Sequence, residues 1–201
     1  MIETVIFDLG GVLIDWNPRY VYREIFENEE QMEHFLTEIC GDSWNKAQDA
    51  GRPIAEGNQL LIDQYPEYKT EILTFYERWV EMLGGPIHET VDILRTLHSN
   101  GKARLVALTN WSAETFPIAQ SMYDFLGLFE GILVSGEENL VKPDPKIYEL
   151  LLDRYDINRS KAVFIDDNKD NIIAANNLGL EGWHFTSPQQ LRGQLKKRGL
   201  L

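Results

Sequence analysis

The residue types that could do chemistry stand at the ends of apolar runs in this chain. Three carboxylates, two hydroxyls and one amide occupy such positions: Asp8, Thr109, Asn110, Ser135, Asp166 and Asp167. Carboxylates that are brought together repel one another and are costly to leave unpaired. A bound divalent cation relieves that repulsion, and a site with oxygen ligands only suits Mg²⁺. The pattern predicts a magnesium site if the fold gathers these side chains.

One lysine is a candidate partner for the carboxylates. Lys142 lies in the segment VKPDP, where Pro143 and Pro145 stiffen the chain and hold the residue before each proline extended. An isolated loop lysine is typical of a solvated surface. Beside three carboxylates and a hydroxyl, its ammonium group is instead suited to clamp a bound anion.

Four short apolar runs must position these side chains. They do not alternate with polar residues and are too short for helices, which is typical of strands buried on both faces: Thr4–Phe7, Leu105–Leu108, Gly131–Val134 and Ala162–Ile165. Segments with helical periodicity separate the later runs: Ile87–Asn100, Ser112–Tyr123, Asp144–Tyr155 and Asn168–Leu178. A further strand at Gly182–Phe185 and a helix at Pro188–Arg198 follow. This alternation predicts an α/β fold with a Rossmann-like parallel sheet, whose strands end at one crevice.

The stretch between the first and second runs has a different character. Helical patterns fill it without a convincing strand: Tyr20–Phe26, Met32–Ile39, Ala55–Gln64 and Lys69–Met82. The turn-forming sequence Gly84–Gly85–Pro86 marks its end. We therefore predict a helical insert at residues 17–85 and a core made of residues 1–16 and 86–201.

The composition argues against several classes of partner and site. The 201 residues include 32 acidic and 19 basic side chains, a formal charge of −13, which disfavours binding to nucleic acid or an anionic membrane. The one cysteine, Cys40, rules out an internal disulfide and a multi-cysteine metal site. No apolar run approaches the roughly 18 residues that cross a bilayer, and no leader sequence is evident. We expect a cytoplasmic protein that is a monomer or a homodimer.

Four segments together resemble the motifs of a known family. In chain order they are TVIFDLGGVL, ALTN, VKPDPKIY and FIDDNKDNIIAANNLG. Their order and spacing resemble the four motifs of haloacid dehalogenase-like hydrolases. The resemblance covers residues 1–15 and about 86–190. The helical insert matches the position of the helical (C1) cap in phosphatase-type members of that family.

The resemblance implies hydrolysis in two steps. Asp8 would attack phosphorus to form an aspartyl-phosphate, which water then hydrolyses. Thr109 would bind a phosphoryl oxygen, helped by backbone N–H groups of Gly11 and Asn110. Lys142 would bind the phosphoryl group and restrain Asp8. Mg²⁺ would neutralise charge and orient the group, and the ligands that the resemblance implies are Asp8, the carbonyl of Gly10, Asp166 and Asp167.

Gly10 departs from the family pattern. Most phosphatases of the family place a second Asp two residues after the nucleophile, as a general acid and base worth roughly 10²–10⁴-fold in rate. Three explanations stay open. A cap residue replaces it, the leaving group is good (an anomeric or acyl phosphate), or turnover is slow and the protein binds phosphate. We favour the first two explanations, and the candidate replacements are Asp15, Glu56, Asp49 and His34.

Two other functions remain as alternatives. The dehalogenase branch of the family also lacks the second Asp, attacks carbon and needs no metal. Its last motif carries serines where this chain has Asp166 and Asp167, so we favour phosphoryl transfer over dehalogenation of 2-haloacids. A non-catalytic, regulatory member would bind a phosphorylated ligand, and the retained Asp8, Thr109 and Lys142 argue against it.

Substrate choice would come from the cap. Its segment GDSWNKAQDAGRPIAEG offers Trp44 and Gln48 as substrate contacts, although packing inside the cap explains both residues equally well. We expect the substrate to be a small phosphorylated metabolite, such as a sugar phosphate, because a cap over the crevice excludes large substrates.

Overall fold

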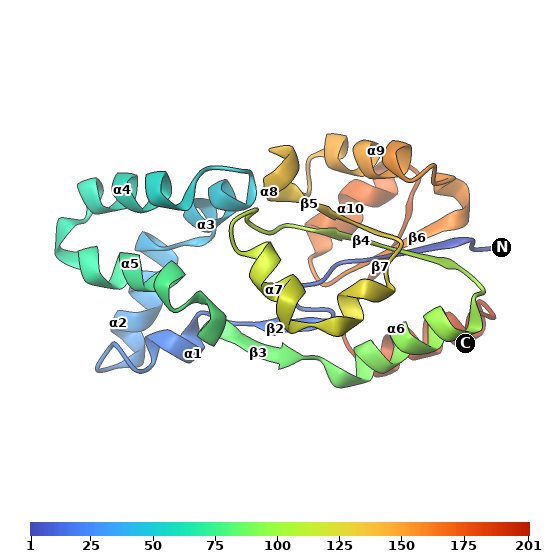
Figure 1. Ribbon diagram of the computed structural model, residues 1–201, viewed down its shortest axis with the longest axis horizontal. Coiled ribbons are helices and arrows are strands. Elements are labelled where there is room, and N and C mark those ends of the chain that lie inside the picture. Colours follow the sequence, from blue (N-terminus) through green and yellow to red (C-terminus); the bar gives the residue numbers. More distant parts are fainter.

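Five parallel strands form the central sheet of the computed structural model, which describes residues 1–201 (Figure 1). Their spatial order is β5–β4–β1–β6–β7. Their bounds lie within two residues of the predicted ones: β1 Thr4–Phe7, β4 Arg104–Thr109, β5 Gly131–Val134, β6 Ala162–Asp166 and β7 Glu181–His184. The Rossmann-like α/β class predicted from the sequence is confirmed.

Alternate residues of each strand enter two separate parts of the core. In β1, Val5 and Phe7 belong to one hydrophobic cluster and Ile6 belongs to another. Residues of α6 and α11 complete the first cluster, and residues of α9 and α10 complete the second. These helices are α6 His88–Asn100, α9 Pro145–Arg154, α10 Lys169–Asn177 and α11 Pro188–Lys197. Figure 1 shows α9 above the sheet and α6 below it, so both faces are covered and the strands are unbroken apolar runs.

Side-chain caps set where several helices begin. Asp144 accepts the N–H of Lys146 at the start of α9, and Asn168 accepts the N–H of Asp170 at the start of α10. The predicted first residues of these two helices are therefore their N-caps, which satisfy N–H groups that have no partner inside the helix. Two shorter helices follow β4 and β5: α7 Phe116–Met122 and α8 Ser135–Glu138. None of the helices has the length and apolar character needed to cross a membrane.

A lobe of helices lies to one side of the sheet (Figure 1). Its α-helices are α1 Arg19–Tyr22, α2 Glu29–His34, α3 Asp42–Asp49, α4 Ile54–Gln64 and α5 Lys69–Glu77. A π-helical segment, Phe35–Ile39, and a 3₁₀ segment, Trp79–Met82, continue α2 and α5. Tyr22 and Phe35 pack with ring centroids 5.0 Å apart, in an aromatic core of this lobe. The helix α3 falls in a stretch for which no helix was predicted.

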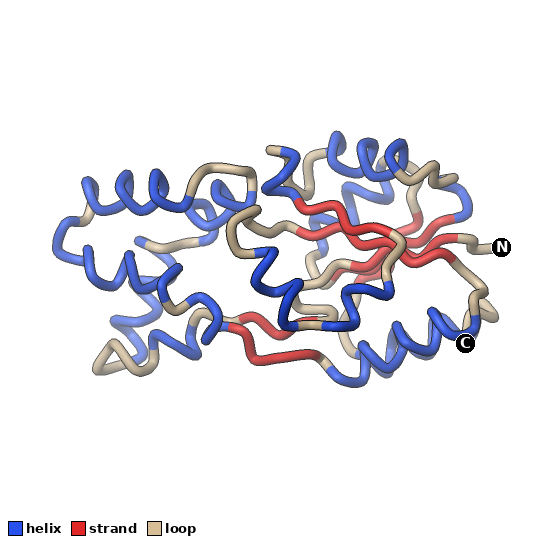
Figure 2. Tube along the Cα trace, viewed as in Figure 1, coloured by secondary structure: helices blue, strands red, loops and turns tan.

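A two-stranded antiparallel ribbon joins the lobe to the sheet (Figure 2). It pairs β2, Ile14–Trp16, with β3, Leu83–Pro86. The expectation that residues 18–85 contain no strand is therefore wrong. The sequence LGGP has little intrinsic strand preference, and β3 forms because it pairs with a segment on the far side of the insert. The ribbon lies at the residues where the sequence predicted the two domain boundaries.

Candidate active site

Adjacent parallel strands bring the carboxylates together. Phe7 of β1 lies opposite Ile165 of β6, so the next residues, Asp8 and Asp166, emerge side by side at the carboxyl edge of the sheet. Asp167 follows directly. Carboxylate oxygens of these three residues all lie within 4.8 Å of one another. The structure therefore gathers the three acidic residues that the sequence singled out.

Lys142 lies between two of these carboxylates and is almost fully buried. Its Nζ is 2.9 Å from Oδ2 of Asp8 and 2.7 Å from Oδ2 of Asp166, and it donates to the carbonyl of Leu108 at 3.1 Å. These three contacts use all three N–H donors of the ammonium. Asn110 holds the backbone of Lys142 from both sides, because its Nδ2 donates to the carbonyl and its Oδ1 accepts the N–H. The loop lysine thus points inward, as the stiffened VKPDP segment predicted.

Three carboxylates and one ammonium leave the cluster with excess negative charge. Burial raises the pKa of Asp8 well above its usual value, against the attraction of Lys142, and Asp166 and Asp167 raise it further. Burial and the charge of Asp166 also raise the pKa of Asp167. Burial works to lower the pKa of Lys142, but Asp8 and Asp166 outweigh that effect and raise it, so the ammonium stays charged. An all-oxygen donor set with this imbalance fits Mg²⁺.

The three acidic residues differ in how many hydrogen bonds their carboxylates already accept from the protein. Asp166 accepts hydrogen bonds from Lys142, from the side-chain amide of Asn171 and from the backbone N–H of Asn168. Asp8 accepts from Lys142 and from the N–H of Leu9. Asp167 has more contact with solvent and its carboxylate lies against Gly11. Asp8 and Asp167 are therefore better placed than Asp166 to give oxygens to a metal ion.

Thr109 offers an uncommitted hydroxyl beside this cluster. It ends β4, the neighbour of β1 in the sheet, and only 1% of its surface is exposed. Its Oγ1 has no hydrogen-bond partner. A buried hydroxyl left unpaired costs about 1–3 kcal/mol, which a bound oxyanion would recover. This is the group that the sequence assigned to a phosphoryl oxygen.

The two glycines after Asp8 have different surroundings. Gly11 has a φ of +70°, and a side chain there would collide with the carboxylate of Asp167. Its N–H donates to the carbonyl of Ile14 at 2.9 Å. The N–H that the resemblance assigned to phosphate therefore already has a partner within the turn. At Gly10 an added Cβ would meet no atom within 4 Å, so the space next to its Cα is open.

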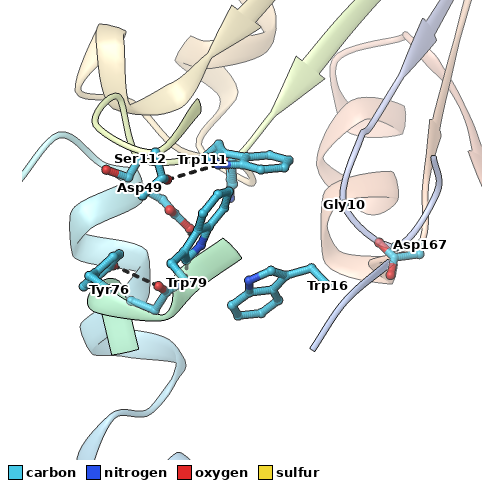
Figure 3. A pocket seen from close by; sticks show the side chains of 12 residues that line it. Gly10, Trp16, Asp49, Tyr76, Trp79, Trp111, Ser112 and Asp167 are labelled. Atoms are coloured by element: carbon cyan, nitrogen blue, oxygen red, sulfur yellow. Dashed lines mark hydrogen bonds between the residues drawn. The ribbon is translucent and has the colours of Figure 1, made fainter. Parts of the chain in front are cut away.

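A cavity of about 230 Å³ lies between the acidic cluster and the helical lobe. Figure 3 shows Asp49, Ser112 and Tyr76 on the side away from Gly10 and Asp167. The aromatic part of its lining comes from both lobes and consists of Trp16, Tyr76, Trp79 and Trp111. Asn110, which the sequence assigned to substrate binding, also lines it. The cavity therefore joins Gly10, Asn110 and Asp167 of the predicted site to residues of the helical lobe, whereas Asp8, Thr109 and Lys142 are not among the residues that line it.

Trp44 and Gln48 are not among the residues that line this cavity. The indole N–H of Trp44 donates to the carbonyl of Gly57 at 2.9 Å, and its ring packs edge-on against Phe75. Gln48 is fully buried inside the helical lobe. The structure therefore does not bring these two residues, which the sequence offered as substrate contacts, to the cavity. Their neighbours on α3, Asn45 and Asp49, line the cavity instead.

Several lining residues had no clear signal in the sequence. Trp111 and Ser112 directly follow ALTN, and that position could have drawn attention to them. Tyr76 and Trp79 sit in a segment whose apolar pattern is the same as that of an ordinary core helix. Only the packing of the lobe against the sheet brings them to the cavity.

Comparison with known proteins identifies the family. A model of haloacid dehalogenase-like hydrolases matches residues 2–179. A sesquiterpene phosphatase of Aspergillus oryzae is 29% identical over 184 residues, 92% of this chain and 90% of that protein. A phosphorylated carbohydrates phosphatase of Thermotoga maritima is 26% identical over 185 residues, 89% of this chain and 82% of that protein. An enzyme of this family from Bacteroides thetaiotaomicron, solved with magnesium and inorganic phosphate, shares the fold with a TM-score of 0.70, 23% identity and coverage of 92% and 95%. The chain belongs to the haloacid dehalogenase-like hydrolases.

Proposed function

We propose that this hydrolase is a Mg²⁺-dependent phosphatase of a small phosphorylated metabolite, with Asp8 as the nucleophile. The observation that carries the proposal is the buried arrangement of Asp8, Lys142 and the unpaired hydroxyl of Thr109 around one edge of the sheet. It combines a nucleophile, a fixed cation and a free donor, which are the groups that phosphoryl transfer needs. The names of the related phosphatases support the same reaction class.

The residues act in a defined order in this mechanism. Asp8 attacks phosphorus while Lys142 holds it in position and opposes the rise in its pKa, and the hydroxyl of Thr109 donates a hydrogen bond to a phosphoryl oxygen. Water then attacks the aspartyl-phosphate and releases inorganic phosphate. Asp8, the carbonyl of Gly10 and Asp167 would hold Mg²⁺, with Asp166 beside them. The bound ion supplies charge neutralisation at the phosphoryl group.

The cavity supports a substrate with a small polar leaving group. Its volume of about 230 Å³ suits a group of the size of one sugar ring. Aromatic rings form one part of the lining, while Asn45, Asp49 and Ser112 give it hydrogen-bonding groups. An apolar substrate chain would bury these polar groups without giving them hydrogen-bond partners, which costs free energy. We therefore propose a sugar phosphate rather than a terpenyl phosphate as the substrate.

A panel of phosphate esters tests this function. It comprises p-nitrophenyl phosphate, hexose 1- and 6-phosphates and a terpenyl phosphate, each assayed with Mg²⁺ and with EDTA. We expect metal-dependent release of phosphate that Asp8→Asn abolishes. The control Asp153→Asn changes an exposed aspartate on α9 and should leave this activity intact. Halide release from 2-haloacids without metal would instead establish a dehalogenase. Phosphate binding without turnover of any ester would establish a non-catalytic binding protein.

A further inference from the structure

The cavity contains a second carboxyl group that the proposed mechanism has not used. Asp167 and Asp49 are the two acidic residues that line it. Asp167 belongs to the acidic cluster, whereas Asp49 ends α3 in the cap. Figure 3 shows the Asp49 side chain across the cavity from Gly10, the position that lacks the family's acid. A substrate in the cavity would lie between the two.

The core holds Asp49 in this place. Ser135, the first residue after β5, donates its hydroxyl to the carbonyl of Asp49 at 2.6 Å. Two residues later, Gly51 packs so closely against Asn139 that a side chain at Gly51 would collide with it. The N–H of Ile54 donates to the carboxylate of Glu114 at 2.7 Å. These contacts dock the segment 49–54 onto the core, so Asp49 is positioned by the same framework that positions the strand ends.

The surroundings of Asp49 suit a proton donor. Burial raises its pKa to about 7. The backbone N–H of Ser112 and the charges of Lys142 and Lys46 act in the opposite direction. Tyr76, the other titratable group on this side of the cavity, stays neutral because burial raises its own pKa. Near neutral pH the Asp49 carboxyl can therefore both give and take a proton.

The other three candidates lie elsewhere. Asp15 accepts a hydrogen bond from the Tyr20 hydroxyl at 2.6 Å in the ribbon that joins the lobes. Glu56 is exposed on α4, and His34 lines a different pocket on the cap. None of the three lines the cavity beside the acidic cluster.

We propose that Asp49 is the general acid and base that replaces the carboxyl missing at Gly10, an inference that rests on the phosphatase function above. As Asp8 forms its bond to phosphorus, the bond from phosphorus to the leaving oxygen breaks and that oxygen takes the proton of Asp49. The Asp49 carboxylate then takes a proton from the attacking water, whose oxygen bonds to phosphorus. The bond between Asp8 and phosphorus breaks, and phosphate leaves.

Leaving-group dependence tests this role. p-Nitrophenol leaves without protonation, whereas the alcohol of hexose 6-phosphate needs a proton. Asp49→Asn should therefore lower kcat/KM for hexose 6-phosphate by about 10²–10⁴-fold and for p-nitrophenyl phosphate by only about threefold. The pH profile for the hexose ester should lose the limb with an apparent pKa of about 7. Asp63→Asn, at an exposed aspartate on α4, is the matched control and should change neither.

A second variant guards against a purely structural effect. An added Cβ at Gly10 meets no neighbouring atom, and Gly10→Asp restores a carboxyl at the family position. Added to Asp49→Asn, it should recover at least about tenfold in kcat/KM for the hexose ester. Equal losses on both substrates, or an unchanged pH profile, would overturn the role of Asp49 alone. If the wild-type protein hydrolysed no ester, the phosphatase function itself would fall, and this role with it.

Discussion

Replacing Asp49 by Asn should stabilise the protein while lowering its proposed activity. Burial holds the pKa of this carboxyl at about 7, against its ordinary value of 3.8. The folded state therefore binds the proton more tightly than the unfolded state does. The wild-type protein consequently loses stability as the pH rises from 3.8 to about 7, and Asn removes that loss.

The size of the gain follows from the two pKa values. The interval between 3.8 and about 7 corresponds to roughly 4 kcal/mol if it is expressed in full. Asp49 keeps some contact with solvent, and screening by water reduces the cost of its charge. We expect the free energy of unfolding of Asp49→Asn to exceed that of wild type by about 1–3 kcal/mol at about pH 8. At about pH 4 the two proteins should be almost equally stable.

Urea unfolding in EDTA at these two pH values measures the difference. Asp63→Asn serves as the control, because it removes an aspartate from the exposed surface of the same lobe. A gain of the same size at both pH values, or a loss at the higher one, would refute the assignment of a raised pKa to Asp49. If Asp49→Asn gained stability and lost activity, the Asp49 carboxyl would be a group that lowers stability but serves function.

Three further predictions concern residues around the acidic cluster. Gly11→Ala should lower the free energy of unfolding, measured by thermal unfolding, by about 1–3 kcal/mol, because the φ of +70° and the Asp167 carboxylate both oppose a side chain. Gly10→Ala should stay within about 0.5 kcal/mol of wild type. Equal effects of the two substitutions would contradict the geometry. Thr109→Val should lower kcat/KM for phosphate esters by about 10²–10³-fold with little change in unfolding temperature, since Oγ1 has no partner to lose, while Thr109→Ser should keep most activity. Lys142→Met should lower the free energy of unfolding in EDTA by about 3–5 kcal/mol, because two buried carboxylates lose their cation; a neutral result in chemical unfolding would contradict the burial of that pair.

The central sheet and its acidic edge were predictable because their signals are local. A run buried on both faces is apolar throughout, so the strands ending at Asp8 and Asp166 stand out in the sequence. Parallel neighbours end at the same edge, and that geometry alone places the two carboxylates together. Lys142 followed from its stiff loop in the same way. The helix starts at Asp144 and Asn168 could be predicted to within one residue because caps are short-range features.

The cavity wall depended on packing between distant segments. The sequence directed attention to the segment that contains α3, but Trp44 and Gln48 face the interior of the cap while Asn45 and Asp49 face the cavity. A helix presents several faces, and which one meets the core is decided by the elements that pack against it, not by its own sequence.

The chain by itself determined the strands of the central sheet, their polar ends and therefore the acidic edge of that sheet. The tertiary structure decided the partner of β3, the use of the Gly11 N–H and the position of Asp49. Each of these depends on a contact between residues far apart in the chain or on a turn that closes upon itself. Such contacts leave no periodic pattern in the sequence, because their free energy comes from the partner as much as from the residue.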